Sequence, residues 1–363
     1  MDLSETRDAQ AAASEFAGGA VCETVPFGSG HINETYLVTC GAAGSPTRFV
    51  LQRVNRAIFR DPVQVMRNIE RVTAHIAAQV ADEPDAERRV LTLIPARDGR
   101  RWHVDATGET WRAFRCIEGA RTFDEVASAE HAFRAARAFG RFQGQLASLP
   151  EPALTETILD FHNTAKRFAA LEQAIAKDAY GRVDEATAEI EFAMARRVMT
   201  SALVDARLPV RTVHNDTKLN NVLFDEASGE AICVIDLDTV MPGTALSDFG
   251  DMVRTMTCSA AEDERDLSRV AVRMDLFEAV ARGYLAEAGG FLTKDERTLL
   301  VAAGKLIAFE QGNRFLADYF DGDSYYNVQR AGQNLDRART QFKLVESIEE
   351  QEEAMQRLVE AIA

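Results

Sequence analysis

The sequence has few cysteines and no pair of them at metal-binding spacing. Five cysteines are spread through 363 residues, and no CxxC pair occurs. Neither a zinc site nor a disulfide framework is therefore expected. Apolar runs as long as a membrane span are also missing. The first ten residues are polar and acidic, unlike the apolar core of a secretory signal, so we expect a cytoplasmic protein.

Positive charge is scarce as well. Lysine and arginine number 41 against 57 aspartates and glutamates, which gives a formal net charge of −16. This balance argues against nucleic acid or an anionic membrane surface as the main partner. The apolar content of 46% and the charged content of 27% are those of a soluble globular chain. The length predicts two domains or one large two-lobed domain.

The first third of the chain predicts a small β-rich lobe over residues 1–118. Strand-like runs reach the turn at 27–30, resume at 35–38 and continue at 49–53. A helix is predicted to begin at Asp61-Pro62, with apolar residues at helical spacing beyond it. Two further strands are expected at 90–94 and 111–116.

The remainder, residues 119–363, predicts a larger and mainly helical lobe. A long helix is expected at 131–146 and a second helical region at 158–203. Strands are expected at 222–224 and 232–235. After Asp251 the pattern is helical to the end and includes an acidic, solvated final helix at 345–362. The expected fold class is therefore α+β with two lobes.

The segment His214–Asn221 carries the clearest chemical pattern. Asp216 and Asn221 stand five positions apart in a loop between apolar strands, and Asp236 follows the second strand. ATP-dependent phosphoryl transfer on a kinase-like fold needs such a set: a base for the acceptor hydroxyl, and an amide and a carboxylate for Mg²⁺. The alternative, a turn followed by a helix cap, is weakened by the flanking strands. The acidic net charge does not exclude ATP, because a local basic pocket and Mg²⁺ can neutralise its phosphates.

Asp236 is the stronger candidate for the metal carboxylate. It ends an apolar strand, where an uncompensated charge would be costly to bury. Asp238 points the same way in an extended chain and could help, or could serve as a cap or a salt-bridge partner. Asp248 and Asp251 are expected to cap and orient the next helix. Asp248-Phe249-Gly250 spells the metal tripeptide of protein kinases but stands too far beyond the loop.

A glycine turn in the β-rich lobe is a candidate phosphate cradle. Gly28, Ser29 and Gly30 lie between two strand signals, where glycines let the backbone approach phosphates. An ordinary hairpin turn is at least as common, and only the position in this lobe favours the functional interpretation. His31 follows the turn and could reach over the transferring phosphate, or be a surface histidine bonded to its own loop.

The basic residue expected on the third strand is not a lysine. That strand ends Leu51-Gln52-Arg53, and alternation puts Gln52 and Arg53 on opposite faces, so which one faces the nucleotide stays open. Arg53 could replace the lysine because a guanidinium grips phosphate well. Lys218, inside the loop, is the more secure γ-phosphate contact. Arg314 is either a salt-bridge partner or a residue of the substrate cleft.

At these residues the chain resembles the kinase-like phosphotransferases that include aminoglycoside phosphotransferases, choline kinases and homoserine kinases. Within them it is most similar to the N-acetylhexosamine 1-kinases. The matching segments are spread over nearly the whole chain: residues 28–33, 49–55, 214–221, 234–243 and 334–341. The last of these is carried over only as a structural signature.

The resemblance implies a protein-kinase-like bilobal fold that uses ATP and Mg²⁺. It implies transfer of the γ-phosphate to the anomeric hydroxyl of GlcNAc, GalNAc or a related sugar. The roles that it implies are a catalytic base (Asp216), metal ligands (Asn221, Asp236), a phosphate contact (Lys218), a hinge that meets adenine (Arg115, Cys116, Ile117) and sugar contacts (His31, Arg314). The nucleotide-binding candidates from the residues themselves are Gly28, Ser29, Gly30 and either Gln52 or Arg53, and Asn33 is a further candidate for substrate binding. Glu70 is the candidate brace for a strand lysine.

Two other interpretations stay open. The same chemistry could act on choline, homoserine, an aminoglycoside or a cell-wall amino sugar. A nucleotide-binding pseudokinase is the second alternative, and the missing strand lysine is its best support. The sequence does not indicate an oligomeric state.

Overall fold

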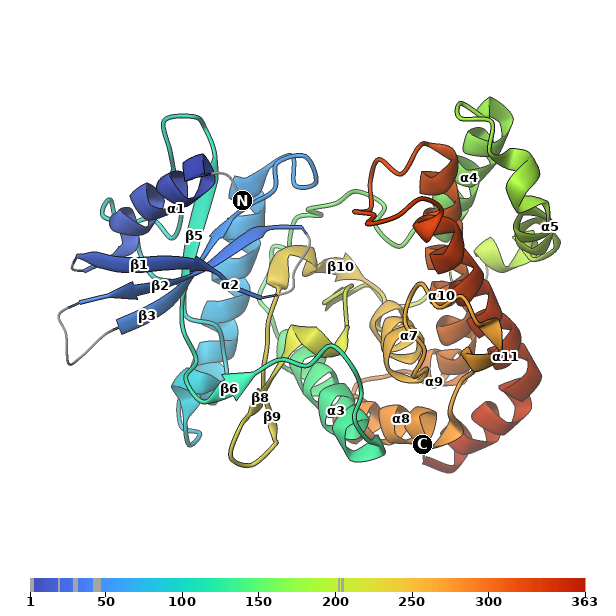
Figure 1. Ribbon diagram of the computed structural model, residues 1–363. Helices are drawn as coiled ribbons and strands as arrows, with labels where there is room; N and C mark the ends of the chain where they lie inside the picture. The colour runs from blue at the N-terminus through green and yellow to red at the C-terminus, as the bar shows by residue number, and fades with distance from the viewer. Residues whose placement is uncertain are drawn as a thin grey trace. The chain divides into compact units, whose positions relative to one another are not determined.

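The computed structural model describes residues 3–18, 20–28, 32–41, 47–201, 203 and 206–362. The chain forms two compact units, each assembled from separate stretches of sequence (Figure 1). Unit 1 comprises Met1–Arg121, Leu149–Ile158 and Phe224–Val240. Unit 2 comprises Thr122–Ser148, Leu159–Leu223 and Met241–Ala363.

Unit 1 is built on a five-stranded antiparallel sheet of order β1-β2-β3-β5-β4. Its strands are β1 (Val21–Pro26), β2 (Glu34–Cys40), β3 (Thr47–Arg53), β4 (His103–Val104) and β5 (Thr110–Arg115). The strands predicted at 35–38, 49–53 and 111–116 are confirmed. The strand predicted at 90–94 is wrong, because there only Leu93 forms an isolated bridge, with Phe114. Pro95 follows at once and has no N–H to extend the ladder.

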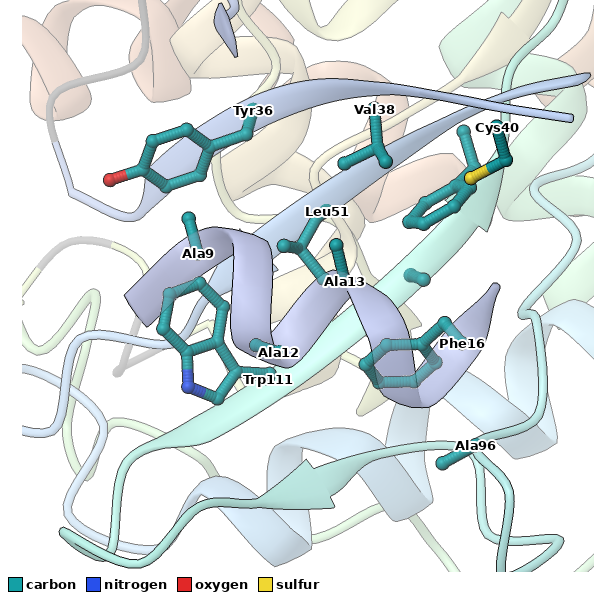
Figure 2. Close-up of a cluster of buried hydrophobic side chains, with 12 residues drawn as sticks. Ala9, Ala12, Ala13, Phe16, Tyr36, Val38, Cys40, Leu51, Ala96 and Trp111 are labelled. Atoms are coloured by element: carbon teal, nitrogen blue, oxygen red, sulfur yellow. The ribbon is translucent and has the colours of Figure 1, made fainter. Parts of the chain in front are cut away.

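One face of this sheet is covered by α1 (Leu3–Phe16), a helix that the sequence analysis did not predict. Ala9, Ala12, Ala13 and Phe16 of this helix point to large side chains of the sheet (Figure 2). The buried cluster is Ala9, Ala12, Ala13, Phe16, Tyr36, Val38, Cys40, Phe49, Leu51, Ala96, Trp111 and Ala113. Small residues at helical spacing let α1 approach the strands closely, and alternation along each strand sends the other side chains to the opposite face.

Helix α2 (Pro62–Val80) begins where the sequence predicts. The Asp61 side chain accepts the N–H of Gln64, and Pro62 occupies the first turn, where its missing N–H costs nothing. On the buried side of α2, Asn68 donates to the carbonyls of Thr155 and Val240 at 2.7 and 3.3 Å. Through these bonds, α2 holds the segments 149–158 and 224–240, which are distant from it in sequence, within unit 1.

The remaining elements of unit 1 are short. They are η1 (Ala86–Arg88), β6 (Ala120–Arg121), β8 (Val222–Asp225), which crosses into unit 1 at Phe224, β9 (Ala231–Val234) and η5 (Leu237–Thr239). Strands β6, β8 and β9 form a second sheet in that order. The strands predicted at 222–224 and 232–235 are confirmed.

Unit 2 is mainly helical. Its helices are α3 (Ala129–Leu146), α4 (Thr164–Lys177), α5 (Thr187–Ala195), α7 (Ala245–Met256), α8 (Met274–Ala288), α9 (Lys294–Thr298), α10 (Leu300–Phe320) and α11 (Gln333–Ile362). Short 3₁₀ helices are η2 (Val183–Ala186), η3 (Arg197–Ser201), η4 (Leu219–Asn221) and η6 (Leu267–Arg269). Strands β7 (Arg211–Val213) and β10 (Met241–Gly243) pair antiparallel. Helix α3 packs on α8 so closely that a Cβ on Gly140 would lie 2.7 Å from the Tyr284 carbonyl oxygen.

Two expectations about these helices are corrected. The final helix is not merely a solvated helix at 345–362, because α11 begins at Gln333 and buries Val345, Ile348 and Val359 among others. Its acidic composition conceals an apolar stripe against α10. The helical region predicted at 158–203 is divided into α4, η2, α5 and η3.

The described residues contain no helix that is long and apolar enough to cross a membrane.

Candidate active site

The loop His214–Asn221 follows β7 in unit 2, includes η4 at its end, and brings three predicted residues together. The Asn221 amide nitrogen donates to the Asp216 carbonyl at 2.8 Å and to Asp216 Oδ2 at 3.0 Å. Lys218 Nζ lies 3.0 Å from the same Oδ2. The Asp216 side chain is 23% exposed and that of Lys218 41% exposed. A carboxylate, a cation and an amide thus meet at one accessible point.

Asp216 is held in its ionised form. Its partial burial works to raise the pKa, but the charge of Lys218 and, to a smaller extent, His214 and Arg254 outweigh it. The pKa of the Asp216 carboxyl therefore lies below its usual value. An ionised carboxylate can accept the hydrogen of a hydroxyl group, which a neutral one does poorly.

Asp248 fixes the start of this loop. Its carboxylate is fully buried and accepts the N–H of His214 at 2.9 Å and that of Asn215 at 2.6 Å. Its carbonyl accepts the Thr217 hydroxyl at 2.7 Å, and Gln143 donates to its side chain at 2.6 Å. The prediction that Asp248 caps α7 is therefore wrong. From the first turn of α7 this aspartate binds another segment, while Thr244 takes the N-cap position.

Asp251 does not cap the helix either. It forms an ion pair with Arg254, 2.8 Å away and one turn further along α7. Burial of Arg254 opposes its charge, but Asp251 and Glu262 raise its pKa further above the usual value. Arg254 is thus a permanent buried cation whose field also reaches Asp216.

A histidine that the sequence analysis did not single out holds the loop from the other side. His162 Nε2 lies 3.1 Å from the Asn215 carbonyl, and Nδ1 lies 2.8 Å from Glu310 Oε1. Thr164 donates to the second oxygen of Glu310 at 2.6 Å. Burial works to lower the pKa of His162, but Glu310 raises it above the ordinary value. No motif indicated this contact, because its partners are 53 and 148 positions away in the sequence.

Asp236, the predicted metal carboxylate, belongs to unit 1. It follows β9 in a left-handed backbone conformation with φ of 58°. Asp238, two residues further on, is buried and fully engaged: Arg112 binds both of its carboxylate oxygens, and Asn33 donates to Oδ2. Asp238 is therefore a salt-bridge partner, not the second metal ligand that the sequence also allowed.

Asn33, which the sequence analysis gave as a candidate for substrate binding, takes part in the same contacts. Its amide nitrogen donates to Asp238 at 2.5 Å, and its amide oxygen accepts the N–H of Asn55 at 3.0 Å. Both ends of the side chain are thus engaged within unit 1. Asn33 connects the segment after the glycine turn to the segment after Asp236.

The structure separates Gln52 from Arg53. Gln52 accepts from Arg112 Nε at 2.9 Å and donates to Thr35 at 3.1 Å, on the sheet face away from α1. Arg53 lies on the α1 face, paired with Glu34 and over the Trp111 ring. Gln52 therefore lies on the same face of the sheet as Arg112, which binds Asp238, and Arg53 lies on the other face.

A family model, described as the phosphotransferase enzyme family (APH), matches residues 23–290. The match includes strands of all three sheets and the loop that carries Asp216. This chain belongs to the phosphotransferase enzyme family.

Solved structures agree on the fold. A microcompartment-associated aminopropanol kinase is 18% identical, with a TM-score of 0.66 over 96% of this chain and 98% of that one. An aminoglycoside phosphotransferase from Alicyclobacillus acidocaldarius is 13% identical, with a TM-score of 0.64 over 97% and 96%. A spectinomycin phosphotransferase, in complex with ADP and spectinomycin, is 11% identical, with a TM-score of 0.59 over 94% and 96%. The expected kinase-like bilobal α+β fold is confirmed.

Within this phosphotransferase, the nucleotide-binding predictions are only partly described. Gly28 has a φ of 82°, a conformation that favours glycine. A Cβ at this position would meet no atom within 4 Å. Ser29, Gly30 and His31 lie outside the described residues. Glu70 does not brace a strand cation, because it is half-exposed and 3.8 Å from Arg101.

The predicted hinge follows the last residue of β5. The N–H groups of Arg115 and Cys116 donate to the carbonyls of Thr92 and Arg48, at 2.9 and 3.4 Å. These two donors therefore hold the sheet together. Recognition of adenine by this segment would fall to its carbonyls and to the N–H of Ile117, and it stays a prediction.

Arg314 lies on α10 among aromatic rings rather than in a salt bridge. Its guanidinium carbon is 5.2 Å from the Phe161 ring centroid and 5.7 Å from that of Tyr326, and Nη1 donates to Gln311 at 3.1 Å. Burial works to lower its pKa, but the neighbouring tyrosines and Glu310 raise it. Phe161, Arg314 and Tyr326 form an aromatic–cationic patch of partly exposed side chains.

The C-terminal signature shapes the loop beside this patch. Asp318 accepts the N–H groups of Ser324, Tyr325 and Tyr326 at 2.8 to 3.0 Å. The buried Asn334 donates to the same Asp318 at 2.9 Å. Residue 334 therefore contributes to the site indirectly, by fixing the turn that presents Tyr326.

Proposed function

We propose that this phosphotransferase is a kinase that transfers the γ-phosphate of ATP to a hydroxyl group of a small molecule. The acceptor that we propose is the anomeric hydroxyl of an N-acetylhexosamine such as GlcNAc or GalNAc. The observation that carries the chemistry is the contact of ionised Asp216 with Lys218 and Asn221. The sugar acceptor rests on the similarity of five sequence segments to the sugar 1-kinases.

The step needs a base and a cation, and the loop supplies both. Asp216 accepts the hydrogen of the acceptor hydroxyl as the oxygen forms its bond to Pγ. The bond from Pγ to the oxygen that leaves with ADP breaks, and the proton ends on Asp216. Lys218, half-exposed and beside Asp216, offsets negative charge on the transferring phosphoryl group.

The donor atoms of this chain fit magnesium. The described residues contain no group of three or more His, Cys, Asp or Glu side chains that could hold a metal by themselves. Mg²⁺ is commonly bound by one or two protein oxygens, with phosphate oxygens and water as the other ligands. Asn221 and Asp236 would supply an amide oxygen and a carboxylate. When bound, the ion would neutralise phosphate charge and orient the nucleotide.

The aromatic–cationic patch favours a neutral acceptor. Phe161 and Tyr326 offer ring faces of the kind on which sugars stack, and Arg314 offers hydrogen-bond donors. A cationic amino alcohol would meet the fixed charge of Arg314. The similarity to an aminopropanol kinase nevertheless makes an amino alcohol the second candidate.

The test is an acceptor screen with purified full-length protein, ATP and Mg²⁺, in which ADP release is measured. We expect turnover with GlcNAc or GalNAc and none with their 1-O-methyl glycosides, which lack the anomeric hydroxyl. Turnover with the methyl glycosides would show that another hydroxyl is phosphorylated. Turnover with aminopropanol, ethanolamine or choline alone would replace the sugar by the second candidate.

A further inference from the structure

Unit 1 contains a buried cation on β5. The Arg112 side chain is 1% exposed, although an arginine is rarely enclosed without a partner. In the sheet, Arg112 stands directly opposite Gln52, near the end of β3 where the sequence lacks the lysine of kinase-like folds. The positive charge on this face of the sheet thus comes from β5.

The partner of Arg112 is Asp238. Two guanidinium nitrogens bind the two carboxylate oxygens, Nη2 to Oδ2 at 3.0 Å, and Asp238 is itself 3% exposed. The third nitrogen, Nε, donates to Gln52, which in turn donates to Thr35. A forked guanidinium with all three nitrogens engaged fixes the direction of its carboxylate far better than a single-point ammonium would.

The turn that contains Asp238 is also held at its backbone. Thr157 donates to the Asp238 carbonyl at 2.8 Å, and Asn68 donates to the Val240 carbonyl at 3.3 Å. At the start of the same turn, Asp236 has a φ of 58°, which side chains other than glycine seldom adopt. Such a conformation persists only where the surroundings impose it. The bonds at 238 and 240 hold the residues that directly follow it in the same turn.

We propose that Arg112 is a positioning residue for Mg²⁺ binding: through Asp238 it holds the turn in which Asp236 presents its carboxylate. The inference rests on the proposed function. Arg112 does not touch the nucleotide in this account, since its three nitrogens are engaged inside unit 1. Arg112 therefore does not replace the missing β3 lysine as a phosphate contact; its effect is on the turn that carries the metal carboxylate.

The test compares Mg²⁺ binding in matched variants. The double variant Arg112→Met/Asp238→Leu removes both charges, and apolar replacement of a buried ion pair is usually tolerated by the fold. Arg112→Lys keeps the charge and loses the fork, and it serves if the double variant does not fold. Arg100→Met is the control, because it removes an exposed arginine of unit 1 that pairs with the neighbouring Asp98 and has no proposed role in binding. The readout is the Mg²⁺ concentration at half-maximal thermal stabilisation in the presence of the non-hydrolysable ATP analogue AMP-PNP.

We expect the double variant to need about tenfold more Mg²⁺ or worse, as for other residues that orient a metal ligand, and Arg112→Lys to fall in between. Arg100→Met should match the wild type. Folded Arg112 variants with the Mg²⁺ dependence of Arg100→Met would overturn the inference alone. A wild-type protein that is not stabilised by AMP-PNP and Mg²⁺ would overturn the proposed function, and the inference with it.

Discussion

The backbone of Asn215 is held on both sides in the left-handed conformation, which residues other than glycine and asparagine seldom adopt. Its φ is 66°, its N–H donates to Asp248 and its carbonyl faces His162. A residue in this region costs about 1–3 kcal/mol. Buried hydrogen bonds to charged groups are each worth about 1.5–3 kcal/mol, so they offset the cost. These two bonds thereby fix the backbone from which the side chain of the next residue, Asp216, projects.

The role of Asp216 as base gives the first prediction. Asp216→Asn keeps the shape of the side chain but removes the acceptor of the proton, so turnover should fall about 100-fold or more. Binding of AMP-PNP and Mg²⁺, measured by calorimetry, should stay near the wild-type value. The exposed Asp82→Asn serves as the control. Turnover of the Asp216 variant near that of the control would contradict the assignment.

The second prediction concerns His162 and the pH dependence of stability. The pKa of His162 is raised by Glu310, so its stabilising contribution is complete below the ordinary value of 6.5 and is lost as pH rises through the raised value. The pKa of Glu310 is lowered, so its contribution is present above the ordinary 4.5 and is lost as pH falls through the lowered value. Asp251 and Arg314 also face His162, with opposite effects. The pair therefore stabilises most between those values.

His162→Gln removes this titration while keeping an amide that can donate. The free energy of unfolding in urea should favour the wild type by about 1.5–3 kcal/mol at about pH 6, and by less at about pH 9. His75→Gln, a partly exposed histidine of α2, is the control and should show no such trend. A wild-type advantage that does not shrink with pH would show that His162 acts by packing alone.

At the scale of elements, helices hold the loop His214–Asn221 in place. Helix α7 supplies Asp248 to this loop, and α10 supplies Glu310 to His162, which contacts the loop at Asn215. In unit 1, α1 covers one face of the sheet (Figure 2). Arg53 lies on that face, and Gln52 and Arg112 lie on the opposite one. The covered side is thus a hydrophobic core, and the other carries a polar network beside the buried Phe114.

The third prediction tests the contribution of α1. Phe16 is 5% exposed and packs in the cluster between α1 and the sheet. Phe16→Ala should lower the free energy of unfolding by about 3 kcal/mol or more, since it removes a buried ring and leaves a cavity. Gln10→Ala, on the exposed side of the same helix, is the control. Equal urea midpoints for the two variants would show that α1 does not stabilise unit 1.

At the scale of the whole molecule, each unit is made from separated stretches of chain. Residues 1–121 contain the five-stranded sheet, but unit 1 also needs 149–158 and 224–240. The reason is visible in its buried polar groups. Arg112 needs Asp238, and Asn68 needs the carbonyls of Thr155 and Val240. A buried cation without its partner is strongly destabilising.

The fourth prediction follows from this composition. A fragment that ends at Arg121 should not fold cooperatively, because Arg112 would be buried without Asp238. Circular dichroism should show no sigmoidal thermal transition in the fragment, whereas the full chain, as the control, should show one. A cooperative transition in the fragment would show that residues 149–158 and 224–240 are dispensable to unit 1.

Local patterns in the sequence were sufficient for much of this protein. The strands around residues 35–38 and 49–53, the start of α2 at Asp61-Pro62 and the loop from His214 to Asn221 all follow from short-range preferences. Asp216, Lys218 and Asn221 could be grouped because the six residues from 216 to 221 cannot spread far apart. Helix α1 also had a signal, alanines and Phe16 at helical spacing, which the sequence analysis did not use.

Only the tertiary structure decided the contacts between residues far apart in sequence. It showed that Asp238 belongs to Arg112, that Asp248 anchors the loop instead of capping α7, and that His162 holds Asn215. The physical reason is that a buried charge takes as its partner whatever the chain topology brings within hydrogen-bonding distance. Sequence spacing shows which residues can act together in one loop. It does not show that Arg112 pairs with Asp238, 126 positions further along the chain, because only folding brings the two together.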